Sequence, residues 1–189
     1  MRCDHFDAGT CRSCSLLPQP YERQLAGKAE AVAATLSPVL GADEIAWLAP
    51  ASSPQKGFRT SAKLVVGGTR RRPTLGILGP DRRGIDLPGC PIQHPAINRA
   101  TPGLKRFIRS LSLTPYDVPT KRGELKNILI TVGAGERLMI RFVLRTRERV
   151  SDIRSALPLL RNLVPSAHVV TANIHPTHEA IVEGPDEII

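Results

Sequence analysis

The segment LKNILITVGAGERLMIRFVL, residues 125–144, decides the fold of this chain. It contains two runs rich in β-branched and other apolar residues, Leu125–Val132 and Leu138–Leu144, joined by the short sequence GAGER. Such residues favour strands, and a short connection that contains glycine favours a tight turn between antiparallel strands. The segment therefore predicts a β-hairpin.

The hairpin is flanked by segments with helical and strand-like spacing. Pro95–Leu111 and Val150–Val164 place apolar residues at intervals of three and four, which predicts amphipathic helices. Further strands are expected at Phe58–Val66, Thr74–Leu78, Val169–Ile174 and Ala180–Val182. The order of these elements favours an α+β fold in which an antiparallel sheet is covered by helices.

The N-terminal part of the chain has a different character. The segment between Pro18 and Pro38 has helical spacing, and the segment from Trp47 to Gln55 contains two prolines and two serines, which predicts a loop. We therefore expect two domains. Residues 1–45 would form a cysteine loop and one helix, and residues 46–189 would form the α+β domain.

The cysteines suggest a metal centre. Three of them lie within twelve residues, and the fourth follows after 75 intervening residues. Four soft thiolates suit a tetrahedral metal or an iron–sulfur cluster. A structural zinc ribbon usually has two close C-x2-C pairs, and this chain has one, so the pattern favours a [4Fe-4S] cluster with four-cysteine zinc as the alternative. The predicted ligands are Cys3, Cys11, Cys14 and Cys90.

Two simpler explanations of the cysteines are less favoured. A disulfide framework would need an oxidising compartment, yet the N-terminus, MRCDHFDAG, is not an apolar signal segment. Unrelated buried thiols would prefer apolar neighbours, whereas Cys11 and Cys14 lie in the polar sequence TCRSCS. No stretch approaches the length of an apolar membrane span. We therefore expect a soluble, cytoplasmic protein without a membrane partner.

The positive charge of the chain is concentrated in one block. The formal net charge is +9, and residues 57–149 hold 19 Lys and Arg against 6 Asp and Glu. Such a block is typical of a nucleic-acid-binding surface, and acidic lipid is the weaker alternative because no large apolar face accompanies the charge. The cations expected to contact phosphates and sugars are Arg59, Lys63, Lys105, Arg106, Arg109, Lys121, Arg122 and Lys126.

Few other side chains suggest a site. Phe58 and Tyr116 are the aromatic residues that could stack on bases, unless they belong to the core. His168, His175 and His178 lie within eleven residues, but no cluster of Cys, Asp or Glu completes a metal site there. We expect surface or RNA-facing histidines. No catalytic residue is assigned.

Several longer motifs together resemble one known family. They are CDHFDAGTCRSC (3–14), LPGCPI (87–92), LTPYDVPTKRGELKNILIT (113–131), MIRFVLR (139–145) and NIHPTHEAIVEG (173–184). The chain resembles, over essentially its whole length, the bacterial 23S rRNA (uracil-C5)-methyltransferases, the RlmC type in particular. The resemblance implies that the four cysteines ligate a [4Fe-4S] cluster and that the basic α+β segment is a central domain that grips 23S rRNA.

The chain departs from this family in length. The resemblance implies a further Rossmann-type methyltransferase domain, with a glycine-rich S-adenosylmethionine loop, a nucleophilic cysteine and an acidic proton acceptor, none of which has a counterpart in this sequence. The chain is thus expected to be the iron–sulfur and rRNA-recognition half of the enzyme, inactive alone. It would be a truncated product, a fragment or one piece of a split enzyme, and in the last case its partner would be a separately encoded catalytic half. The alternative is a stand-alone iron–sulfur or zinc RNA-binding module without catalysis.

Overall fold

The computed structural model of the protein describes residues 1–40, 46–179 and 181–189. The chain forms two compact units, Met1–Phe58 and Arg59–Ile189. The domain boundary expected between residues 45 and 46 adjoins residues 41–45, which lie outside the described residues, so the predicted domain limits stay a prediction. The first unit contains α1 (Asp4–Asp7) and α2 (Tyr21–Leu36), the latter within the helical segment expected from the sequence.

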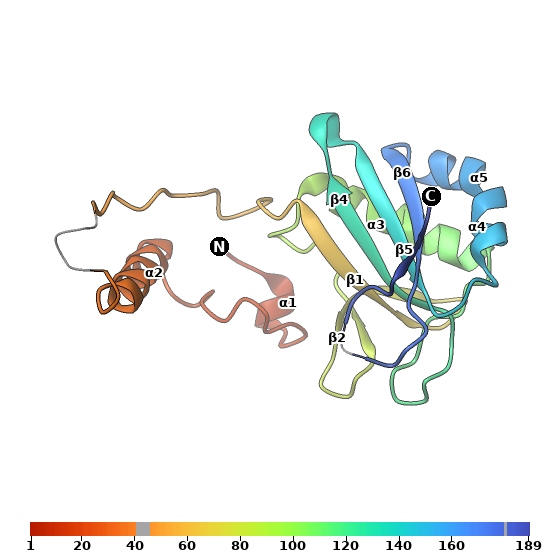
Figure 1. The fold of residues 1–189 in the computed structure, drawn as a ribbon, viewed down its shortest axis with the longest axis horizontal. Coiled ribbons are helices and arrows are strands. Elements are labelled where there is room, and N and C mark those ends of the chain that lie inside the picture. The colour runs from red at the N-terminus through yellow and green to blue at the C-terminus, as the bar shows by residue number, and fades with distance from the viewer. Residues whose placement is uncertain (41–45, 180) are drawn as a thin grey trace. The chain divides into compact units, whose positions relative to one another are not determined.

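The described residues of the second unit form a seven-stranded sheet, three α-helices and one short 3-10 helix (Figure 1). The strands lie side by side in the order β3-β2-β1-β4-β5-β6-β7. The elements are β1 (Ser61–Gly68), β2 (Pro73–Leu78), β3 (Gly84–Asp86), α3 (Pro95–Ser110), β4 (Leu125–Val132), the short 3-10 helix η2 (Ala134–Glu136), β5 (Leu138–Leu144), α4 (Val150–Ser155), α5 (Leu157–Leu163), β6 (Ala167–Ile174) and β7 (Asp186–Ile188).

The α+β class is confirmed, but the sheet is mixed rather than wholly antiparallel. Strands β5 and β6 pair in parallel, whereas every other pair of neighbouring strands is antiparallel. The reason is the connection between β5 and β6. It passes through α4 and α5 and returns the chain in the same direction, as a parallel pair requires.

The predicted hairpin is confirmed at both of its strands. Strands β4 and β5 pair antiparallel, with Ile130 opposite Ile140 and Val132 opposite Leu138. The turn closes with a hydrogen bond of 2.8 Å from the Gly133 N–H to the Arg137 carbonyl. Gly135 within the turn has φ +64°, a left-handed conformation that glycine adopts without strain.

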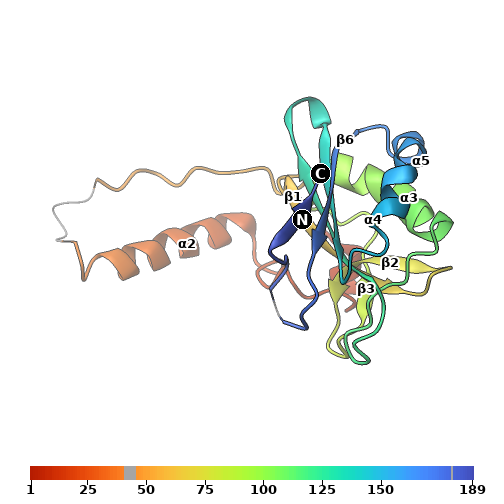
Figure 2. The ribbon, with the colours of Figure 1, turned by 45° about the vertical axis from the view of Figure 1, so that its right-hand side comes forward.

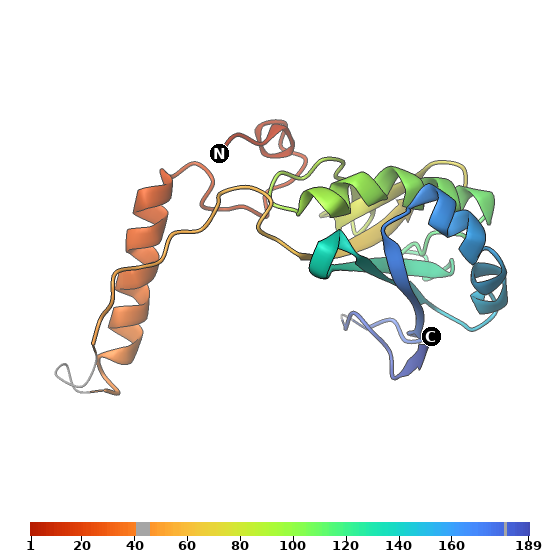
Figure 3. The same ribbon diagram turned by 90° about the horizontal axis from the view of Figure 1, so that it is seen from above.

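One face of the sheet forms the hydrophobic core of the second unit. In β1 the residues Ala62, Leu64 and Val66 are buried, and they alternate with more exposed ones. Helices α3 and α5 lie together on this side of the sheet (Figure 3). Phe107 of α3 meets Phe142 of β5 with ring centroids 5.6 Å apart, and both are fully buried.

No described helix of the second unit covers the other side of the sheet, which we call the open face. Its side chains are those that alternate with the core residues along four neighbouring strands. From β1 to β6 they are Ser61, Lys63, Val65, Asn127, Leu129, Thr131, Met139, Arg141, Val143, Val169, Thr171 and Asn173. The face mixes polar and apolar residues, and its members Val143, Thr171 and Asn173 are buried.

Two expectations near the C-terminus are wrong. The single helix expected over Val150–Val164 is divided into α4 and α5, because Pro158 stands in the first turn of α5 and the intervening Ala156 has φ −93° and ψ 8°. The strand expected at Ala180–Val182 is absent at Ile181 and Val182, and Ala180 lies outside the described residues. The strand in this region is instead β7, which pairs with β6.

Candidate nucleic-acid interface and cysteine sites

The three N-terminal cysteines lie in one short stretch of the first unit. Backbone hydrogen bonds hold the conformation of this stretch. The carbonyl oxygen of Cys3 accepts a hydrogen bond from the N–H of Asp7 at 2.9 Å, which starts α1. The N–H of Cys11 donates to the carbonyl of His5 at 3.0 Å. These two backbone contacts keep Cys3 and Cys11 near α1. Cys14 follows Cys11 three positions later.

Cys90 belongs to the second unit and lies in a well-defined turn. It follows Gly89, whose φ is +67°, a conformation that favours glycine. The carbonyl of Cys90 accepts hydrogen bonds from the N–H of Gln93 at 3.1 Å and from Asn98 Nδ2 at 3.0 Å. The position of this fourth thiol is therefore set by the fold of its own unit.

The cysteines offer suitable donors for a metal centre. Among residues 1–40, 46–179 and 181–189, no three His, Cys, Asp or Glu side chains form a group that could hold a metal ion. All four thiols are partly exposed, and thiolates are the usual ligands of iron–sulfur clusters and structural zinc. The cluster on these cysteines therefore stays a prediction.

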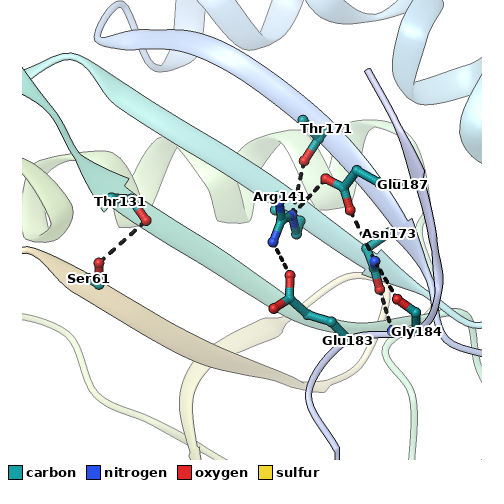
Figure 4. Close-up of polar contacts among 8 residues, drawn as sticks. All are labelled: Ser61, Thr131, Arg141, Thr171, Asn173, Glu183, Gly184 and Glu187. Atoms are coloured by element: carbon teal, nitrogen blue, oxygen red, sulfur yellow. Dashed lines mark hydrogen bonds and ion pairs between the residues drawn. The ribbon is translucent and has the colours of Figure 1, made fainter.

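Arg141 is the central charged residue of the open face (Figure 4). Its guanidinium forms ion pairs with Glu183 and, at 2.7 Å, with Glu187, and its Nε also lies 3.3 Å from Thr171 Oγ1. Asn173 Nδ2 donates to Glu187 at 3.0 Å. These contacts tie the C-terminal segment to the sheet and neutralise Arg141.

The structure divides the cations that were expected to contact nucleic acid between two sides of the second unit. Lys63 lies on the open face. Arg106 and Arg109 are exposed on α3, whose inner side packs against the opposite face of the sheet. Arg59, just before β1, and the loop residues Lys121 and Arg122 are also exposed. The eight predicted residues thus do not form one continuous surface.

Two of the eight cations are already engaged within the protein. Lys105 Nζ lies 2.6 Å from a carboxylate oxygen of Asp86. Lys126 is only 8% exposed, its Nζ donates to the carbonyl of Thr177 at 2.5 Å, and this ammonium lies 4.9 Å from the centre of the Tyr116 ring. Burial lowers the pKa of Lys126. This lysine is an interior group rather than an exposed phosphate ligand.

Two further exposed cations near these loops were not among the residues predicted from the sequence. Arg82 and Arg83 lie in the turn between β2 and β3, which runs beside the loop of residues 115–122 in both Figure 1 and Figure 2. The turn sequence Gly79-Pro80-Asp81 was the signal that could have placed them at a hairpin tip. We call these two arginines, together with Lys121 and Arg122 of the neighbouring loop, the basic end.

The aromatic and histidine candidates differ from one another in how far they are buried. His175 is 2% exposed and is therefore not a surface residue, because it follows β6 directly and packs near Lys126. Tyr116 is 9% exposed, and its hydroxyl lies 2.9 Å from Nδ1 of His178. Phe58 is half exposed. Burial, and secondarily the charge of Lys126, lower the pKa of His175 and favour its neutral imidazole.

The comparisons with known proteins point to one family. No protein-family model matches the sequence. The 23S rRNA (uracil(747)-C(5))-methyltransferase RlmC of Enterobacter sp. strain 638 is 43% identical over 190 residues, and that of Cronobacter sakazakii is 45% identical over 189 residues. Each match covers 100% of this chain and 50% of the relative. The chain is homologous to half of an RlmC methyltransferase.

The chain thus spans about half the length of the RlmC relatives it matches. A solved structure supports the fold. The Pyrococcus abyssi tRNA (uracil-54, C5)-methyltransferase, in complex with S-adenosyl-L-homocysteine, superposes with a TM-score of 0.65 at 18% identity. The superposition covers 92% of this chain and 39% of that one. At this identity the likeness concerns the fold alone. None of the described helices is both long and apolar enough to cross a membrane.

Proposed function

We propose that this chain is the rRNA-recognition half of an S-adenosylmethionine-dependent 23S rRNA uracil-C5 methyltransferase. The observation that carries the proposal is the match of the entire chain to RlmC relatives at 43–45% identity. The basic block of residues 57–149 supports contact with RNA, since cations supply most of the affinity for a phosphate backbone. An enzyme of this kind would act in the cytoplasm, where ribosomal RNA is modified.

The methyl transfer itself requires groups that we do not assign to this chain. Carbon 5 of uracil becomes nucleophilic only after a thiolate adds to carbon 6, and a base must later remove the proton from carbon 5. The four cysteines are proposed as cluster ligands, so the nucleophile and the cofactor pocket would belong to the remaining length of a complete enzyme. The comparisons do not support a separately encoded catalytic half. We expect this chain alone to bind rRNA without methylating it.

The RNA surface is proposed to include the basic end and the adjoining part of the open face. Arg82, Arg83, Lys121 and Arg122 come from two loops that lie side by side, and Lys63 projects from the strand nearby. The cations of α3 project on the other side of the sheet, so one RNA segment cannot reach both groups through the same contact. Contacts at the basic end are expected to be with phosphates and sugars.

A matched pair of charge reversals tests this surface. Lys121→Glu with Arg122→Glu, and Arg106→Glu with Arg109→Glu, change the net charge equally but on different sides. Each variant is titrated against a 23S rRNA hairpin at several salt concentrations. We expect the affinity of the unmodified chain to fall by about 0.7 log units per neutralised phosphate for each log unit of salt. The first variant should bind much more weakly, and the second should bind nearly as the unmodified chain does.

The outcomes separate the two parts of this proposal. A flat salt response of the unmodified chain would rule out RNA recognition through the basic block. Equal losses for the two variants would retain RNA recognition but reject the basic end as its main surface.

We also propose a structural [4Fe-4S] cluster on Cys3, Cys11, Cys14 and Cys90. The support is the donor set of four partly exposed thiols and the hydrogen-bonded turn that presents Cys90. A cluster would join the N-terminal stretch to the second unit, because its ligands come from both. Anaerobic purification followed by iron, acid-labile sulfide and zinc analysis tests it. One zinc per chain without sulfide would replace the cluster by a four-cysteine zinc site.

A further inference from the structure

A pocket of about 230 Å³ opens where the open face meets the loops at the basic end. Lys63 and Val65 of β1 and Asn127 of β4 line it from the sheet, and Leu78 lines it from the end of β2. Its volume is below the range of roughly 300–1,000 Å³ typical for drug-sized ligands. The pocket is therefore large enough for a single small group, such as one ring, and too small for a larger ligand.

Two buried polar side chains contribute to the lining of this pocket. Lys126 is 8% exposed and His175 is 2% exposed. His175 Nε2 lies 3.0 Å from Thr177 Oγ1, but its Nδ1 is buried without a hydrogen-bond partner among the described residues. Buried nitrogen atoms of this kind are nearly always paired in native proteins, because leaving them unpaired is costly. Because His175 lines the pocket, its buried and unpaired Nδ1 points to a partner from outside the chain.

The protonation state of His175 restricts what that partner is. Burial and the neighbouring Lys126 lower the pKa of the imidazole, which favours its neutral form. In this form Nδ1 offers one lone pair or one N–H, depending on the tautomer that Thr177 selects. Glu179, which also lines the pocket, adds an acceptor. A phosphate group carries only acceptors, whereas the edge of a nucleobase carries N–H and C=O groups in one plane.

The walls of the pocket match the faces of such a ring. Leu78 is 42% exposed and Ile181 is 55% exposed, and both line the pocket together with Val118. Arg82 and Lys63 line the same pocket. Apolar walls with a few polar groups at defined positions are typical of sites that take a planar ligand, and the two cations suit its flanking phosphates.

We propose that this pocket receives one unstacked base of the bound RNA, with its edge hydrogen-bonded to His175 Nδ1 and its flanking phosphate near Arg82 and Lys63. Proteins usually read RNA sequence in such unstacked bases rather than in paired regions. The proposal rests on the proposed function, since it presupposes RNA binding by this unit. It adds base selection to a surface that would otherwise recognise only the phosphate backbone.

The test uses the full 189-residue chain and a 23S rRNA hairpin with an unpaired loop, compared with a duplex that has the same number of phosphates. His175→Leu removes the polar edge, Leu78→Trp fills the pocket while keeping His175, and His168→Leu is the matched control. His168 is an exposed histidine outside this pocket, with Nδ1 3.1 Å from the Ser166 carbonyl. Circular dichroism establishes that each variant is folded.

We expect His175→Leu and Leu78→Trp each to weaken binding of the loop RNA about tenfold and to leave duplex binding unchanged, a loss that corresponds to about 1.4 kcal/mol. The salt slope should not change, because no phosphate contact is removed. Unchanged loop affinity in both variants would overturn the pocket proposal while RNA recognition stands. A reduced salt slope in His175→Leu would show that the pocket holds phosphate and would also overturn it. Absence of RNA binding by the unmodified chain would instead reject the proposed function.

A second measurement does not depend on the choice of hairpin. Nitrogen NMR of the His175 imidazole is recorded while cytidine monophosphate, uridine monophosphate or inorganic phosphate is added. A nucleotide that shifts the Nδ1 resonance, with no shift from phosphate, supports the base pocket. A shift with phosphate alone, or no shift with either nucleotide at millimolar concentration, contradicts it.

Discussion

The two units of this chain are stabilised in different ways. In Met1–Phe58 none of the described residues is buried, and neither α1 nor α2 contributes a core side chain. In Arg59–Ile189 a continuous core joins one face of the sheet to α3 and α5. The second unit can therefore fold by burying apolar surface. The described part of the first unit has no such core and is held by hydrogen bonds, most of them local and a few longer-range, such as that from the Ser53 N–H to the Tyr21 hydroxyl. The comparison indicates that the first unit needs another source of stability, for which we propose the cluster.

The largest expected effect on stability follows from removing the proposed cluster. Cys14→Ser should abolish the cluster and leave the first unit without a folded state, since metal centres of small domains contribute on the order of 10 kcal/mol to folding. Limited proteolysis with mass spectrometry should then show cleavage throughout residues 1–58 and protection of residues 59–189. Ser15→Ala is the matched control and should retain both iron and protection. Equal protection of the first unit in both variants would contradict this account.

The next effect tests the second unit by itself. Phe142→Ala removes a fully buried ring that meets Phe107 and should lower the free energy of unfolding by about 3–5 kcal/mol. Val32→Ala on α2 is the comparison, because this side chain is 50% exposed and should change stability by less than about 0.5 kcal/mol. Urea denaturation followed by circular dichroism measures both. A loss for Val32→Ala as large as that for Phe142→Ala would remove the distinction between the units.

The smallest effect is a pH dependence of the second unit. Burial raises the pKa of Glu187, but hydrogen bonds from Thr171, Asn173 and Arg141 outweigh this and place the pKa below its ordinary value of 4.5. Stability from this carboxylate is therefore present above the unfolded-state pKa and is lost as the pH falls through the lower folded-state value. Glu187→Gln should remove that dependence and should cost about 1 kcal/mol at pH 7, since the side chain remains 30% exposed.

The measurement is the difference in unfolding free energy between Glu187→Gln and the unmodified chain from pH 7 to pH 3. The difference should shrink towards the acid end. A difference that stays constant over this range would show that the carboxylate contributes no pH-dependent stability. Asp152→Asn, a change of an exposed carboxylate on α4, provides the control for general charge effects.

Much of the second unit was predictable because its strong elements are locally consistent. Leu125–Val132 and Leu138–Leu144 are strands with the expected bounds, since β-forming residues surround a glycine turn. The parallel pairing of β5 with β6 was not predictable from strand composition. It depends on the path taken by α4 and α5, and that path depends on Pro158 and on packing against α3.

The sequence by itself determined the α+β class, the hairpin, the basic block and the spacing of the four cysteines, because each is a matter of composition or short-range pattern. Only the tertiary structure decided which of the charged side chains are exposed and on which side of the sheet they lie. It placed Lys126 inside the protein, moved the cations of α3 to the side opposite Lys63, and brought Arg82 beside the loop of residues 115–122. Burial and proximity depend on residues far apart in the chain, and a linear pattern of charges does not contain that information.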